Sequence, residues 1–170
     1  GGKAENAVPA ALPMPEVSPA SAGSTEVDLP PAARTALLRE LRGTLGQGDC
    51  DAFAPDQLSV LRLTTDKLLV QVPCWTGAYN EGAAYWVANQ AAPFKPALVT
   101  TGASDYAAGT ISSAHKGRGL GDCWASEEWV WDGKRFARTL EATTGMCRLV
   151  EAGGAWHLPT YVAKVTRGLR

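Results

Sequence analysis

The stretch Trp129-Val-Trp-Asp-Gly-Lys-Arg-Phe136 carries the clearest indication of the fold. Asp132-Gly133 stands between two runs of apolar, strand-favouring residues, and this dipeptide is typical of the tight turn that joins two antiparallel strands. The length of such a turn fixes which residues face each other across the hairpin. A two-residue turn predicts three cross-strand pairs, the last between opposite charges: Trp131 with Lys134, Trp129 with Phe136, and Glu127 with Arg138.

A second hairpin is predicted earlier in the chain, because the two-residue periodicity of strands recurs in residues 58–63 and 68–72. Residues 64–67 form its four-residue loop. Pro73 is expected to end the pairing, since proline has no backbone N–H to donate to a ladder. Four more strands are expected, the third of them followed by a turn at Gly153-Gly154: residues 84–88, 97–100, 146–150 and 161–165.

The period changes to that of a helix at residues 30–42. Asp28 is a plausible N-cap, and Gly43 and Gly46 would stop the helix. Its apolar stripe consists of Ala33, Leu37, Leu38, Leu41 and Leu45. The pattern as a whole predicts a mainly β, α+β fold: an antiparallel meander or sandwich-like sheet with one N-terminal helix and two disulfides.

The first 29 residues are rich in Pro, Ala, Ser, Glu and Gly and lack an apolar period. Such a segment does not fold alone, so residues 1–29 are interpreted as a linker or as an extended arm laid on the domain. Residues 30–170 would form a single disulfide-stapled, β-rich domain. Gly1-Gly2 without a methionine is typical of a cloning scar, so a signal peptide or a further upstream domain is expected to have been removed.

The even number of cysteines predicts two disulfides. Zinc is disfavoured, because no C-x2-C pair exists and both histidines lie far from any cysteine in the sequence. Hairpin geometry returns the chain to the strand ends at which cysteines stand, and this favours one of three connectivities: Cys50–Cys74 and Cys123–Cys147. Disulfides persist in oxidising compartments, so a periplasmic or secreted protein is expected.

Composition excludes several classes of partner. The 170-residue chain has a net charge of −1 and no basic stripe interleaved with aromatics, so nucleic acid is not expected. No apolar run approaches the roughly 20 residues that span a bilayer. The sequence shows no calcium loop of the D-x-D-x-D type and no cofactor motif, so neither a metal nor a cofactor is expected.

Several motifs stand out along the chain: Val72-Pro-Cys-Trp-Thr-Gly-Ala-Tyr-Asn80, Gly117-Arg-Gly-Leu-Gly-Asp-Cys123, Trp129-Val-Trp-Asp-Gly133, Phe136, Cys147-Arg148 and Trp156-His-Leu-Pro-Thr160. Together they resemble the DUF1176 family of exported bacterial proteins of unknown function. The resemblance runs from about Cys50 to Val165, and it implies export without implying an activity, substrate or cofactor. Members of that family look about twice as long, so the chain would correspond to their C-terminal half.

The first candidate site is the Gly- and Ser-rich region of residues 102–121. It lacks the full phosphate-loop pattern, and no helix is predicted after it, so a nucleotide site is not expected. One interpretation is a turn that lets Cys123 reach its partner. The other is an exposed binding loop over residues 112–118, with these candidate contacts: Ser113, His115, Lys116 and Arg118, beside Ser112.

The second candidate site follows Cys74. Trp75 and Tyr79, with Asn80 and Glu81, could line a ligand surface on which a sugar or peptide stacks. Alternatively, Trp75 and Tyr79 simply cover the disulfide and close the core.

Catalysis has little support in the sequence. His115 has serine neighbours, but no orienting carboxylate or oxyanion hole can be deduced. Glu127 and Glu128 are adjacent on a strand and point to opposite faces, so they cannot act together on one glycosidic bond.

Three hypotheses for function follow from the sequence. The first is a non-catalytic envelope domain that binds a ligand, with a protein favoured over a glycan. One version of it is an inhibitor or immunity-type partner of a cell-wall enzyme. The second is an envelope hydrolase with His115 as base, and the third is a structural half of a two-domain exported protein.

Overall fold

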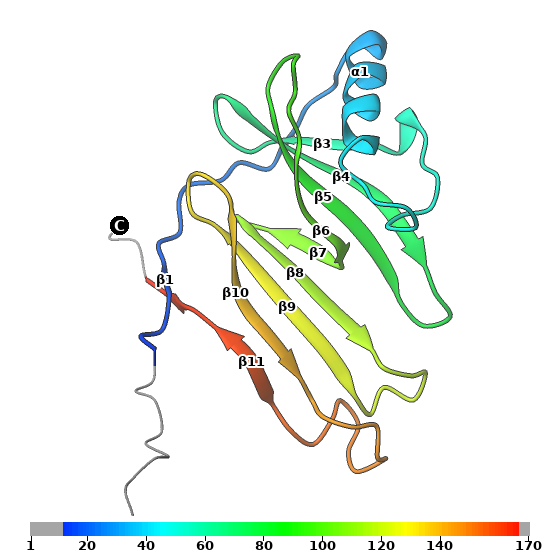
Figure 1. Cartoon of the computed structure of the whole chain (residues 1–170), viewed down its shortest axis with the longest axis vertical. Helices are drawn as coiled ribbons and strands as arrows, with labels where there is room; N and C mark the ends of the chain where they lie inside the picture. The colour runs from blue at the N-terminus through cyan, green and yellow to red at the C-terminus, as the bar shows by residue number, and fades with distance from the viewer. Residues whose placement is uncertain (1–11, 167–170) are drawn as a thin grey trace, which may run out of the picture.

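The computed structural model describes residues 12–166 of the chain, which form twelve strands, one α-helix and a short 3-10 helix. Figure 1 shows their arrangement. In chain order the elements are β1 (Glu16–Val17), β2 (Thr25–Glu26), α1 (Pro31–Arg42), η1 (Pro55–Gln57), β3 (Ser59–Arg62), β4 (Lys67–Thr76), β5 (Glu81–Asn89), β6 (Ala97–Ala103), β7 (Asp105–Ala107), β8 (Thr110–Lys116), β9 (Trp124–Trp131), β10 (Phe136–Thr143), β11 (Leu158–Val162) and β12 (Lys164–Val165).

The strands form two five-stranded antiparallel sheets with an uninterrupted meander from β3 to β11. The first sheet has the order β2-β3-β4-β5-β6, and the second has the order β11-β10-β9-β8-β7. The chain passes from one sheet to the other at Ser104, between β6 and β7. The arm segment β1 pairs in parallel with β12. The expected class, a β-rich antiparallel meander with one helix, is confirmed.

The helix α1 covers one face of the first sheet (Figure 1). Leu37, Leu38 and Leu41 are buried against alternate residues of β4 and β5. The leucines recur at helical spacing, and the sheet residues that they meet alternate along their strands, so each element has one apolar face to bury. Sheet residues of this core include Val60, Leu68, Val70, Val72, Ala84 and Trp86.

The opposite face of the first sheet packs on the second sheet. Trp131, Ile111 and Phe136 from the second sheet meet Leu69 and Tyr85 from the first. Leu69 and Tyr85 alternate along β4 and β5 with the residues that face α1, as the pleat requires. The first sheet is therefore buried on both faces, between α1 and the second sheet.

The β9–β10 hairpin is present, but its predicted register is wrong. Trp131 faces Phe136 and Trp129 faces Arg138, so the loop has the four residues 132–135. The carboxylate of Asp132 accepts the backbone N–H groups of Lys134 and Arg135, each at 2.8 Å. This side-chain cap stabilises the longer loop in place of a two-residue turn. Because the error is two residues, it moves no side chain to the other face of the sheet.

The expected Glu127–Arg138 pair survives in a different geometry. A bulge between Arg138 and Leu140 shifts the register, so that Glu127 lies opposite Glu141. Arg138 reaches both carboxylates, with N–O distances of 3.4 Å to Glu127 and 2.6 Å to Glu141. The two residues thus interact diagonally across the sheet and are not a directly facing pair.

Three other local expectations are also wrong. Pro73 does not end the pairing: β4 continues to Thr76, and Pro73 faces Ala83 on β5. Proline is tolerated there because the other neighbour, β3, has its last pair at Ser59 and Gln71, which leaves that edge of β4 open. The Gly- and Ser-rich region contains β7 and β8, whereas residues 146–150 form no strand.

The helix begins one residue later than expected. Pro30 is its N-cap, and no side chain caps it. Asp28 instead binds the Arg34 guanidinium at 3.3 Å. In the described part of the arm, β2 pairs with β3 and joins the first sheet.

The two disulfides are Cys50–Cys74 and Cys123–Cys147, which is the predicted connectivity. Each spans 24 positions of sequence. The first joins the segment after α1 to β4, and the second joins the start of β9 to the loop after β10. Two disulfides indicate an oxidising compartment outside the cytoplasm. Among residues 12–166, no helix is long and apolar enough to cross a membrane.

Replacing Trp86 tests the core beneath α1. Trp86 is fully buried, and its indole N–H donates to the Thr44 hydroxyl at 2.8 Å. Trp86→Ala should lower the free energy of unfolding by about 3–5 kcal/mol through lost burial and the cavity left behind. Trp156→Ala is the matched control: Trp156 is 64% exposed, so its loss should cost no more than about 0.5 kcal/mol. Urea denaturation measures both, and equal losses would contradict this core.

Candidate functional site

A cleft lies between the two sheets, at the end of β4 and β8. Its volume is about 400 Å³. Aromatic rings and polar groups line it together, which is typical of ligand sites. The lining includes Trp75, Tyr79, Asn80, Glu81, His115, Lys116 and Trp124. The structure thus brings together two sequence regions that were predicted as separate candidate sites.

Trp75 forms one wall of the cleft. It follows a bulge in β4, and its indole N–H donates to the carbonyl of Thr101 at 2.9 Å. Gly82 on β5 lies directly against the indole, and a Cβ atom at that position would overlap it. Trp75 also packs against the core beneath α1. Its position is therefore fixed from two sides, and it closes the core as well as lining the cleft.

His115 packs against Trp75 in the lining of the cleft. The ring centroids are 5.1 Å apart at an interplanar angle of 63°, an edge-on arrangement. The His115 Nε2 atom is buried and has no hydrogen-bond partner within the described residues. Buried polar atoms are nearly always satisfied in folded proteins. This nitrogen is thus a polar group that a ligand or a water molecule could satisfy.

Lys116 is the last residue of β8, and the Asn80 side chain holds its backbone in place. Its backbone N–H donates to the Asn80 side chain at 2.8 Å, and its carbonyl accepts from the Asn80 amide at 2.9 Å. Its ammonium group lies 5.6 Å from the centre of the Trp124 ring. This is cation–π geometry, and it leaves Lys116 at the rim of the cleft.

The expectation of an exposed loop over residues 112–118 is therefore wrong. Residues 112–116 belong to β8, and Ser113 is only 4% exposed. Small residues have weak strand preference, but pairing with β9 along the whole of β8 satisfies their backbone groups. Of this segment, only residues 117–118 lie outside the strand.

Arg118 is tied to the chain beside the second disulfide. Its guanidinium binds the Asp122 carboxylate through two hydrogen bonds, at 2.8 and 2.6 Å. The Asp122 side chain is only 5% exposed and also accepts the Leu149 N–H at 2.7 Å. These bonds, that from Arg118 foremost, hold the pKa of Asp122 well below its usual range. The Arg118 side chain is therefore bound within the fold by this ion pair.

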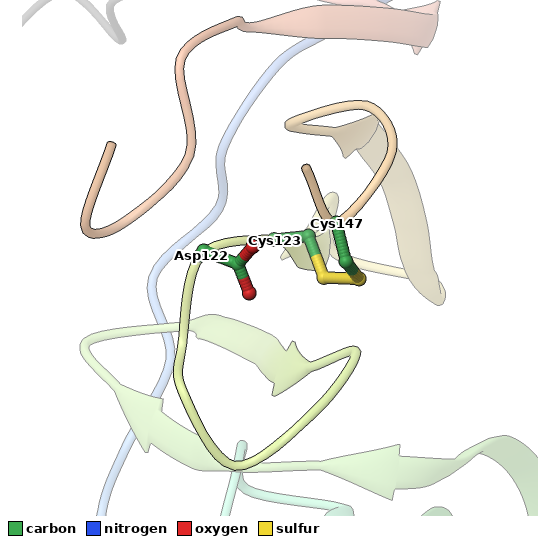
Figure 2. Close-up of side chains that lie close together, drawn as sticks. All are labelled: Asp122, Cys123 and Cys147. Carbon is green, nitrogen blue, oxygen red and sulfur yellow. A yellow bond between two sulfur atoms is a disulfide. The ribbon is translucent and has the colours of Figure 1, made fainter. Parts of the chain in front are cut away.

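Figure 2 shows Asp122 next to the Cys123–Cys147 disulfide. The carboxylate and the two sulfur atoms lie within 4.8 Å of one another. Metal binding to cysteine requires a thiolate, whereas these sulfurs are bonded to each other. The arrangement is therefore a structural one in the oxidised protein.

The glycines of this region explain how it packs. A Cβ atom at Gly117 would lie 2.7 Å from the Cys123 sulfur, and one at Gly119 would lie 2.8 Å from the Tyr79 ring. The first contact supports the interpretation that the glycine-rich turn makes room for the disulfide. The second places the same turn against Tyr79, an aromatic residue of the cleft.

One pair of carboxylates was not predicted from the sequence. Glu127 and Glu141 share one face of the second sheet and, together with Ser113 and His115, line a depression of about 360 Å³. Glu128 points the other way, as expected, and accepts a hydrogen bond from Thr139. Only the bulge in β10 places Glu127 opposite Glu141, and no local pattern predicted that bulge.

Comparison with known proteins assigns a family to this two-sheet, two-disulfide protein. The sequence profile of the family described as "Protein of unknown function (DUF1176)" matches residues 1–163, nearly the whole chain. The chain belongs to this family. The match begins well before Cys50, where the resemblance in motifs starts.

A relative from Escherichia coli (strain K12), "Uncharacterized protein YpfG", is 26% identical over 117 residues. The match covers 59% of this chain and 34% of that protein, so the chain spans about a third of the relative's length. No solved structure matches the chain significantly.

The Arg118–Asp122 pair predicts a pH-dependent loss of stability. Because the folded-state pKa of Asp122 is lowered, the carboxylate stabilises the fold above its unfolded pKa of about 3.9, and this contribution is lost as pH falls further. Arg118→Ala should therefore lower the melting temperature at pH 7, and the gap to the wild type should close in acid. Arg148→Ala, which removes an exposed arginine, is the control. A gap that is constant down to pH 2 would contradict the assignment.

Proposed function

We propose that this protein is a non-catalytic binding domain of the cell envelope, periplasmic or secreted, with the cleft between its sheets as the ligand site. One observation carries the proposal: three aromatic residues, Trp75, Tyr79 and Trp124, line the same cleft as His115, whose buried Nε2 atom has no hydrogen-bond partner among the described residues. Aromatic faces with a few directed polar groups are the usual components of a site for a polar ligand.

The geometry favours a glycan as the ligand. Tyr79 is 60% exposed although the Gly119 turn lies against its ring, so much of the ring is available for stacking on a sugar. Asn80, Glu81 and Lys116 place amide, carboxylate and ammonium groups around the same space. A sugar hydroxyl can donate a hydrogen bond to the Glu81 carboxylate and accept one from the Lys116 ammonium.

A protein ligand, such as the target of an inhibitor or immunity-type domain, has less support. The sequence favoured a protein ligand because Lys116 and Arg118 were expected to be free cations on a protruding loop. Arg118 is bound to Asp122, and Lys116 lies over Trp124. Neither residue is thus presented as an isolated binding hot spot.

A hydrolase is the second candidate, because His115 lies between the cleft and the depression that contains Glu127 and Glu141. A general base must reach both a nucleophile and an orienting group. Within residues 12–166, no hydrogen bond joins His115 to a serine or a carboxylate. The geometry therefore favours binding over catalysis.

Replacing Tyr79 tests the binding site. Tyr79→Ala should weaken binding of soluble cell-wall glycan fragments by about tenfold, since one lost stacking contact corresponds to roughly 1–1.5 kcal/mol. Trp156→Ala removes a similarly exposed aromatic residue outside the cleft and should leave the affinity unchanged. Isothermal titration calorimetry measures both. If an envelope protein is captured equally by the wild type and Tyr79→Ala while glycans do not bind, the cleft proposal is wrong.

Replacing His115 separates binding from catalysis. If the domain only binds, the wild-type protein should release no reducing ends from cell-wall glycan during long incubation. His115→Gln should then alter affinity alone. Release of reducing ends by the wild type, abolished in His115→Gln and retained in Arg148→Ala, would establish the hydrolase instead.

A further inference from the structure

A second, wider groove lies at the opposite end of the same strands. Its volume is about 940 Å³, and it is lined by the arm at Pro15–Ser18, the start of β4, the end of β5, the start of β6 and the β9–β10 hairpin. The floor is apolar, with Trp129, Phe136 and Val99. The tip of the hairpin at residues 132–135 forms one rim.

Basic side chains are concentrated along this groove. Five line it: Lys67, Lys95, Lys134, Arg135 and Arg138. Arg138 is neutralised by Glu127 and Glu141. The other four have no carboxylate partner among residues 12–166, and Lys67 donates only to the Asn89 amide oxygen, at 2.8 Å. The chain as a whole carries a net charge of −1, so this gathering of cations is local.

Two acidic residues also line the groove, but both carboxylates are bound by other groups and do not pair with the four cations. Glu16 is bound by the Lys164 ammonium at 2.8 Å. The Asp132 carboxylate accepts two backbone N–H groups of the hairpin loop. The space between the walls is therefore bordered by unpaired ammonium and guanidinium groups.

Lys95 occupies a backbone position that suits glycine better than lysine. Its φ is 45°, in the left-handed region that non-glycine residues seldom adopt. Its backbone N–H is held by the Glu40 carboxylate at 2.8 Å, so the position is anchored to α1. The chain thus places a lysine on this rim although the local conformation favours glycine.

We infer that this groove binds a phosphate-bearing ligand. Three of the four unpaired cations are lysines, whose compact ammonium groups bind phosphate as point charges from many directions. Arg135 adds the guanidinium fork that pairs with phosphate oxygens. The apolar floor would contact the organic part of the ligand. The inference is independent of the glycan cleft, which lies at the other end of β4 and β9.

Two charge-matched double variants test the inference, with inorganic triphosphate as the probe. Lys134→Ser/Arg135→Ser should weaken triphosphate binding by about tenfold. Arg39→Ser/Arg148→Ser removes the same charge from exposed positions outside the groove, one of them on α1, and should change the affinity less than about twofold. Isothermal titration calorimetry at low salt gives both values. Equal losses in the two variants would show only general charge attraction and would overturn the proposal.

Lys95→Gly is a second variant that the fold should tolerate, because glycine adopts a φ of 45° freely. It should weaken triphosphate binding several-fold without lowering the melting temperature. An unchanged affinity, or no triphosphate binding by the wild type at millimolar concentration, would overturn the proposal.

Two further probes identify the source of the phosphate. Sedimentation with vesicles that contain phosphatidylglycerol, but not with vesicles of phosphatidylcholine alone, would assign a lipid headgroup. Triphosphate binding without sedimentation would assign a soluble phosphate ester. If polyglutamate of matched charge binds more tightly than triphosphate and depends on the same residues, the partner is an acidic polypeptide, and the phosphate proposal is wrong.

Discussion

The packing of the second sheet onto the first is the contact on which the other features of this protein depend. Trp131, Ile111 and Phe136 meet Leu69 and Tyr85 there, and the rings of Trp131 and Phe136 lie 5.4 Å apart. Where this contact ends, the sheets leave the cleft beside Trp75 on one side and the basic groove on the other. Both candidate sites are thus consequences of where this core stops.

The second disulfide organises one rim of the cleft. It fixes the start of β9 and requires glycine at position 117, while Arg118 is held by the buried carboxylate of Asp122. Gly119 then brings the same turn against Tyr79. The turn at residues 117–122 has the composition of a flexible loop. A covalent bond and an ion pair nevertheless hold it in place. Preorganisation of this kind lowers the entropy lost when a ligand binds.

The two ends of the gap between the sheets differ in chemistry. The cleft combines aromatic faces with neutral and mixed-charge polar groups, whereas the groove combines an apolar floor with unpaired cations. Strands β4 and β9 run from one site to the other. A single ligand with a sugar part and a phosphate part would have to pass around the buried core, so two separate ligands, or two separate parts of one polymer, fit this arrangement better.

Local periodicity and cysteine spacing were enough to predict the β-rich class, the N-terminal helix, the existence of the β9–β10 hairpin and both disulfides. Other features depend on contacts between distant parts of the chain, which local patterns do not encode. The Asp132 side chain selected a four-residue loop, and pairing with β9 made a strand of residues 112–116. The bend of the meander at Ser104 brought Trp75 against His115, 40 positions away in sequence. Periodicity specifies which face of a strand is buried, but only packing between distant strands specifies which side chains meet.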